Sequence, residues 1–186
     1  MKQQSKKKVK KGTCGPDPSH GSFVAGLKGI NSPVADADFI EAGNFLFAIV
    51  GETDSRITAF AIEQGDANKN LKTYTQSLKL DGGQKIASVT FSTPKGGSDS
   101  SNQKQFFVAV ACWEQCRVQV YQLNFKLVTD RGGFSNGQLA FSGLQNVMSN
   151  VHKIPPNKIR LSRQYPKLLV TCGDEKDTEY KLFNIT

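Results

Sequence analysis

The chain has 186 residues, of which 38% are hydrophobic and 22% charged, a balance typical of a soluble globular domain. This composition excludes a collagen and a wholly disordered protein. The longest apolar runs, Phe45–Val50 and Phe106–Cys112, fall far short of the roughly 20 residues that cross a bilayer. No apolar stretch follows the basic N-terminus, so we expect neither a membrane segment nor a secretory signal, and a cytoplasmic or nuclear location.

A block of lysines carries most of the excess positive charge. The formal net charge is +8, from 24 basic and 16 acidic residues. Six of the basic residues fall within the first twelve positions, so the rest of the chain is nearly neutral. We predict a disordered basic tail over residues 1–22, which could contact nucleic acid or a nuclear import receptor, or act only as a solubilising tail. The lysines of its central cluster are Lys6, Lys7, Lys8, Lys10 and Lys11.

Three segments of the chain repeat one pattern, an apolar run followed by a polar turn and an alternating run. Gly51, Cys112 and Gly173 align at a spacing of 61 residues, and Arg56 aligns with Arg117 at the same spacing. Self-similarity at a fixed period is the signature of a repeat architecture. The repeated segments are Phe45–Ile62, Phe106–Leu123 and Lys167–Ile185.

The pattern within each repeat predicts β-strands. A short apolar run rich in Val, Ile and Phe is typical of a buried strand, and the alternation after its turn is typical of a half-exposed partner strand. A further strand is predicted before each copy, and residues 71–80 supply a polar, alternating edge strand after the first copy. The strands predicted upstream are 34–40, 86–92 and 158–162, which gives units of about 34–80, 86–150 and 158–186, the last incomplete.

Tandem antiparallel units of four strands are typical of a β-propeller. Val89–Gly97 resembles the first strand and turn of a WD40 repeat, while Leu168–Asp177 and Lys181–Ile185 resemble its second and third strands. The repeats have neither the Gly-His nor the Trp-Asp pair of the family, so the resemblance is to a degenerate member. It implies an all-β fold over residues 23–186, a partial β-propeller of about three four-stranded antiparallel blades, because a closed ring needs four to eight.

The sequence offers no constellation that predicts catalysis. Its two histidines, His20 and His152, stand in loop-like segments far from a paired nucleophile. Cys112 and Cys116 are separated by three residues, which is the wrong spacing for a zinc knuckle, and no phosphate-binding loop is present. We therefore expect no enzyme activity, no cofactor and no metal.

The turns between the second and third strands of each unit are the predicted partner-binding sites. Such loops emerge side by side on the faces of a propeller, where a tryptophan flanked by acids is suited to anchor an interface. The alternative for the tryptophan is packing between neighbouring blades. The candidate residues are Glu52, Asp54, Trp113, Glu114, Asp174 and Glu175.

These features favour a non-catalytic scaffold, a propeller fragment that binds other proteins through blade-face loops as a subunit of a larger complex. A second hypothesis is a guanine-nucleotide exchange factor for a small GTPase, similar to the propeller that starts coat assembly at the endoplasmic reticulum. The turn Gly51–Asp54 lacks the glycine-rich ion-binding loop of that family. A third hypothesis, which depends on the lysine tail, is a subunit of an RNA-processing or ribosome-assembly complex.

Overall fold

The computed structural model describes most of the chain after the basic tail. The predicted tail, residues 1–22 with all its lysines, lies outside the described residues. The described ranges are 27–64, 71–93, 102–113, 115–133, 135–163, 168–173 and 179–185.

The first sheet is an antiparallel meander of β1 (Val34–Ala42), β2 (Phe45–Glu52), β3 (Arg56–Glu63) and β4 (Thr73–Lys79). β2 and β3 carry the apolar residues of the first repeat and are mostly buried, whereas β4 is largely exposed. This difference follows from position, because the outermost strand of a sheet has solvent along one side. The strands predicted for this unit are confirmed.

The second sheet repeats the same meander with longer strands. It consists of β5 (Ile86–Phe91), β6 (Gln103–Cys112), β7 (Gln115–Thr129) and β8 (Ser135–Met148), in that order. A one-turn 3-10 helix, η2 (Asp81–Gly83), connects the two sheets. The 15 residues of β7 exceed the predicted alternating run, since the pairing with β8 continues to Thr129.

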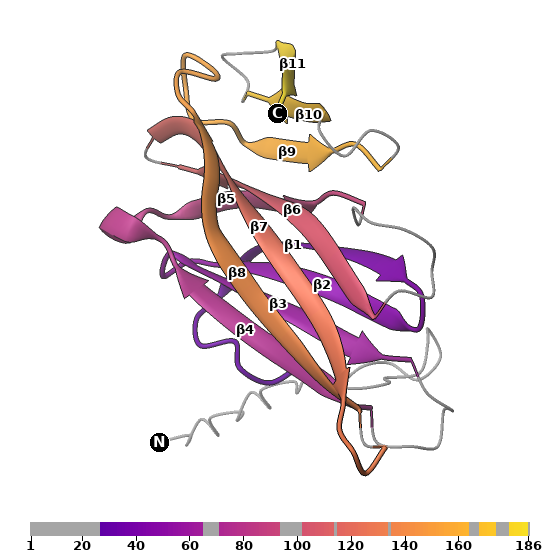
Figure 1. Ribbon diagram of the computed structural model, residues 1–186. Helices are drawn as coiled ribbons and strands as arrows, with labels where there is room; N and C mark the ends of the chain where they lie inside the picture. The colour runs from indigo at the N-terminus through magenta and orange to yellow at the C-terminus, as the bar shows by residue number, and fades with distance from the viewer. Residues whose placement is uncertain are drawn as a thin grey trace, which may run out of the picture.

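The third sheet has the order β11-β10-β9 and is also antiparallel. Its strands are β9 (Lys158–Leu161), β10 (Leu168–Cys172) and β11 (Tyr180–Asn184). Figure 1 shows this small sheet at one end of the molecule, beside β5 and β6 of the second sheet. The prediction of an all-β fold made of antiparallel sheets is confirmed, with four, four and three strands in the described part of the chain.

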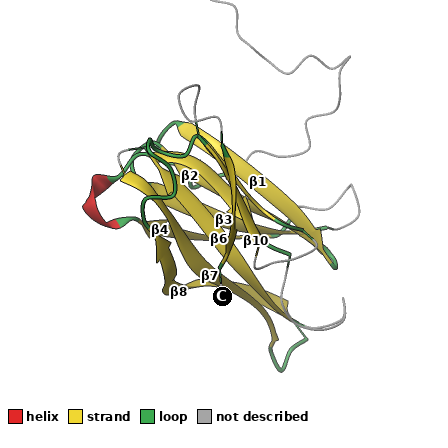
Figure 2. Ribbon diagram, turned by 90° about the horizontal axis from the view of Figure 1, so that it is seen from above, coloured by secondary structure: helices red, strands yellow, loops and turns green. Residues whose placement is uncertain are grey.

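The second sheet lies between the other two. In Figures 1 and 2 it lies face to face with the first sheet, and the two enclose the larger core. Aromatic rings fill that core: the ring centroids of Phe47 and Phe106 are 4.6 Å apart, and those of Phe45 and Phe125 are 4.7 Å apart. A second core, including Val120 and Leu169, fills the space between the second and third sheets. Burial of these apolar faces holds the stack together.

The pairing registers correct one detail of the predicted repeat. Gly51 lies opposite Ile57 in the first sheet, and Ala111 lies opposite Val118 in the second. Gly51 is therefore equivalent to Ala111 rather than to Cys112, as the sequence alignment had it. The turn between β6 and β7 holds one more residue than the turn between β2 and β3. The pairing register shifts between Ala111 and Cys112, as expected for a β-bulge.

The first strands of the three sheets lie side by side, β1 against β5 and β5 against β9. A ladder of polar side chains links β1 to β5. Each of the carboxylates of Asp36 and Asp38 accepts one hydroxyl and one backbone N–H from β5, so backbone donors at the unpaired edge of β5 are satisfied. The donor-to-oxygen distances are 2.6 Å from Ser88 Oγ and 3.0 Å from Val89 N to Asp36, and 2.9 Å from both Thr90 Oγ1 and Phe91 N to Asp38.

The ladder continues from β5 to β9 in the same direction. Ser88 Oγ accepts the backbone N–H of Ile159, and Thr90 Oγ1 accepts that of Leu161, both at 3.3 Å. Each first strand thus supplies side-chain oxygens to the backbone of the next. Arg163, beyond β9, reaches back to Asp38 Oδ1 at 2.8 Å and so ties the third sheet to the first.

Candidate partner-binding cleft

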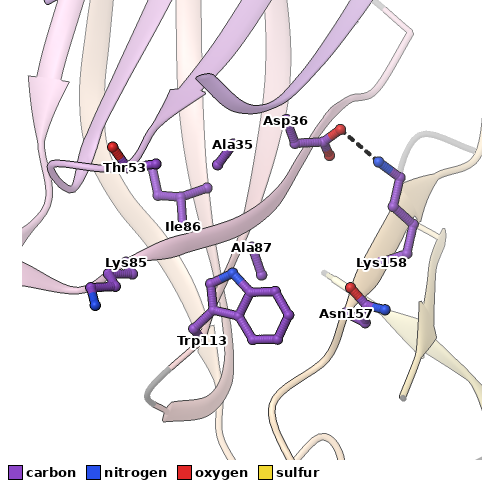
Figure 3. Close-up of a pocket in the computed structure, with 9 residues that line it drawn as sticks. All are labelled: Ala35, Asp36, Thr53, Lys85, Ile86, Ala87, Trp113, Asn157 and Lys158. Carbon is purple, nitrogen blue, oxygen red and sulfur yellow. Dashed lines mark hydrogen bonds and ion pairs between the residues drawn. The ribbon is translucent and has the colours of Figure 1, made fainter. Parts of the chain in front are cut away.

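A cleft of about 440 Å³ opens where the first two sheets and the start of β9 meet. This volume is within the range of small-molecule and side-chain binding pockets. Three segments far apart in the sequence form its walls: the start of β1 with the turn after β2, the start of β5 with the turn after β6, and the start of β9. The lining residues in Figure 3 are Ala35, Asp36, Thr53, Lys85, Ile86, Ala87, Trp113, Asn157 and Lys158.

Trp113 supplies the largest apolar surface of the cleft. It follows β6, and its backbone N–H donates to the carbonyl of Lys85 at 2.8 Å, which fixes the turn against the start of β5. The side chain is 46% exposed, so Trp113 is not packed away between the sheets. In Figure 3 the indole lies between Lys85 at one end of the cleft and Asn157 at the other. An exposed tryptophan in a concave site is a frequent anchor of protein interfaces.

Asp36 and Lys158 form an ion pair at one end of the cleft. The distance from Lys158 Nζ to Asp36 Oδ1 is 2.6 Å, and Figure 3 marks this contact. Burial raises the pKa of Asp36, but the hydrogen bonds from Lys158, Ser88 and the Val89 N–H outweigh it, so the pKa lies below its ordinary value of 3.8. The carboxylate is therefore ionised at neutral pH, with each of its oxygens already accepting a hydrogen bond.

Lys85 stands at the opposite end of the cleft. Its side chain is exposed, and Figure 3 shows the ammonium turned outward at the rim. It forms no ion pair with any residue that the structure describes. Between Lys85 and Lys158, Ala87 and the indole of Trp113 supply the apolar surface, and Asn157 borders it on the Lys158 side. The cleft can thus hold an apolar group in its middle and anionic groups at its ends.

Glu52, predicted to be an exposed binding residue, is buried, with no exposed surface. Its Oε2 accepts the backbone N–H groups of Asn31 at 2.7 Å and Ser32 at 3.0 Å, and its Oε1 accepts the Thr58 hydroxyl at 2.6 Å. Glu52 therefore fastens the segment before β1 to the first sheet. The expectation that it meets a partner is corrected, because a buried carboxylate needs such internal partners.

Asp54 and Trp113 remain at the surface, but they do not form one cluster. Asp54 Oδ2 lies 3.5 Å from the Arg56 guanidinium, and its side chain is absent from the cleft lining. Its neighbour Thr53 lines the cleft instead, so the structure brings the turns of the first two sheets together through Thr53 and Trp113. The remaining predicted binding residues, Glu114, Asp174 and Glu175, lie outside the described residues.

Of the nine lining residues that Figure 3 labels, only Trp113 was among the predicted binding residues. The missed residues with charged or amide side chains are Asp36, Lys85, Asn157 and Lys158. A signal for one of them was present, because Asp36 and Asp38 stand two residues apart in a predicted strand and so point to the same face. Lys85 and Asn157 each precede a predicted strand and carry no comparable signal.

Within the described ranges, no group of three or more His, Cys, Asp or Glu side chains is placed to hold a metal ion. The same part of the chain contains no helix with the length and hydropathy to span a membrane. No protein-family model matches the chain, and no curated protein matches it.

Proposed function

We propose that this chain is a non-catalytic protein-interaction scaffold and that the Trp113 cleft is its partner-binding site. The observation that carries the proposal is the exposed indole in a cleft whose walls come from all three sheets. A partner seated there would contact the whole stack, so the site depends on the assembled fold. Interfaces of this kind are dominated by a few central residues, among which tryptophan is enriched.

We further propose that the three sheets are blades of a degenerate WD40-like propeller, a segment of a ring within a larger complex. The support is the repetition of one meander, with the first strands β1, β5 and β9 adjacent to one another. The polar ladder runs along these strands and repeats the same contact at each step. In a propeller, the first strands would lie around the central channel.

The mechanism of such a scaffold is rigid display. The cleft side chains stand at the ends of paired strands, or in short turns between them, and the ladder fixes those strands to one another. Little conformational entropy is lost when a partner binds residues that are already held in place. A small cleft can therefore give a specific interaction.

Affinity capture with matched variants tests this function. The chain, Trp113→Ala and Tyr180→Ala would each be used to retain proteins from lysate of the source cells. Tyr180 is 76% exposed on β11 and does not line the cleft, so it controls for the loss of an exposed aromatic ring. We expect a set of proteins retained by the chain and by Tyr180→Ala to be lost from Trp113→Ala.

Circular dichroism spectra should show that both variants fold like the parent chain, since Tyr180 is 76% exposed and Trp113 is 46% exposed and outside both cores. If Trp113→Ala folds normally and retains the same proteins as the parent chain, the cleft is not the binding site and the proposal fails.

A further inference from the structure

We infer that the cleft binds an extended segment of a partner protein in which an apolar side chain lies between two acidic ones. This inference deepens the proposed function, on which it rests, by naming the chemistry of the partner. It depends on the arrangement of charge along the cleft: Lys85 at one end, Lys158 at the other, and an apolar surface between them.

The middle of the cleft favours an apolar side chain. Ala87 lies beside the indole of Trp113 and presents only a methyl group there. Ile86, its neighbour on β5, is 1% exposed and packs into the core behind the cleft. A side chain placed on this surface would remove apolar area from water on both sides, which is the main favourable contribution to such contacts. A leucine-sized group is consistent with a cleft of about 440 Å³ that must also admit flanking backbone.

The ends of the cleft favour acidic groups. Lys85 has no ion pair among the described residues, and its exposed ammonium carries three donors. Lys158 uses one donor on Asp36, while 45% of its side chain remains exposed, so further donors are open to a ligand. A carboxylate at either end would gain a charge-assisted hydrogen bond.

A basic segment would find no comparable acceptor. Among the described residues that line the cleft, Asp36 is the only one with a carboxylate. Its two oxygens already accept hydrogen bonds from Ser88, the backbone N–H of Val89 and Lys158. A lysine or arginine of a partner would have to displace Lys158 and would be repelled by the positive charge of Lys85.

Fluorescence titration tests the inference directly, because Trp113 is the single tryptophan of the chain. The probes are four synthetic peptides of Gly and Ser residues that carry three test side chains at every second position, so that all three point to one face of an extended chain. The three test side chains, in order, are Glu-Leu-Glu, Gln-Leu-Gln, Lys-Leu-Lys or Glu-Gly-Glu, and each peptide is named by them. We expect a saturable change in Trp113 emission with Glu-Leu-Glu, weaker binding of Gln-Leu-Gln and Glu-Gly-Glu, and none of Lys-Leu-Lys. Binding of Glu-Leu-Glu should weaken as salt rises, since exposed charges are screened.

Two charge-reversal variants localise the effect. Lys85→Glu should weaken Glu-Leu-Glu binding about fivefold, the size of an exposed ion pair replaced by repulsion. Lys79→Glu, on the outer strand β4 and away from the cleft lining, is the matched control and should leave the affinity unchanged.

Three results would overturn the inference: Lys-Leu-Lys binding as tightly as Glu-Leu-Glu, an unchanged affinity in Lys85→Glu, or no titration with any peptide. Loss of captured proteins from Trp113→Ala would still support the proposed function in each of these cases, so the two failures are distinguishable.

Discussion

Replacing Glu52 should destabilise the first sheet strongly, although the residue stands beside a surface turn. Glu52→Ala removes three hydrogen bonds to a carboxylate, from Asn31 N, Ser32 N and Thr58 Oγ1, and leaves their donors without that acceptor. Each such bond contributes about 1.5–3 kcal/mol, and part of the loss is recovered by local relaxation, so we expect about 4 kcal/mol of lost unfolding free energy. That is a large share of the ~5–15 kcal/mol typical of a domain.

The isosteric variant Glu52→Gln should lose only about 1–2 kcal/mol. Its amide oxygen can still accept the two backbone N–H groups, and the Thr58 hydroxyl can turn its proton toward Ser77 Oγ, which lies 2.9 Å away. Urea denaturation followed by circular dichroism measures both values. Glu41→Ala, an exposed carboxylate on β1, is the control and should change stability by less than about 0.5 kcal/mol.

Trypsin cleavage is a second measurement, specific to the segment before β1 that Glu52 fastens to the first sheet. Lys28 is exposed in that segment, so trypsin should cleave after it faster in Glu52→Ala than in Glu41→Ala. The reasoning is refuted if Glu52→Ala costs no more than the control, or if Glu52→Gln is as damaging as Glu52→Ala.

Three further outcomes follow from the core and from the two shifted pKa values. Gly51→Ala would place a Cβ 2.7 Å from Ile86 Cγ2, so urea denaturation should show a loss of about 1–3 kcal/mol; an unchanged midpoint would contradict the close approach. The pKa of Asp36 is lowered from 3.8 in the folded state, so the ionised carboxylate stabilises the fold above pH 3.8, and this stabilisation is lost as pH falls through the folded-state pKa. The unfolding free energy of Asp36→Asn, measured against pH, should lack this acid-dependent loss. Burial, then the charges of Cys112 and Asp81, raise the pKa of Tyr121 from 10.0 to about 12, so its contribution is lost between pH 10 and about 12, and Tyr121→Phe should flatten that part of the stability curve.

Much of the fold could be predicted from the sequence because strand patterns are local. The apolar run of β2 and the alternation of β4 identify a buried and an edge strand without knowledge of their neighbours. The length of β7 could not be predicted in this way. Its second half is held by pairing with β8, which is a long-range contact, and the register shifts within that pairing have no signal in either strand alone.

The cleft was only partly predictable, because it depends on contacts between sheets. Trp113 could be predicted because it is a tryptophan in a polar turn, a position suited to anchor an interface. Glu52 was misplaced because an acid in a turn normally faces solvent, and only the structure reveals the backbone N–H groups of Asn31 and Ser32 around it. The pairing of Asp36 with Lys158 spans 122 residues, a separation at which the sequence pattern specifies no contact.

The polar ladder along the first strands gives the stack a direction. Oxygens on β1 and β5 accept N–H groups from the following strand, but Lys158 and Arg160 of β9 carry donors only. The backbone N–H groups of a second copy's β1 would therefore find no oxygen there, so identical chains cannot add head to tail by this contact. Repeated sheets risk open-ended association of identical chains. Because β9 carries donors where β1 and β5 carry acceptors, this contact favours a partner strand that supplies hydrogen-bond acceptors to β9.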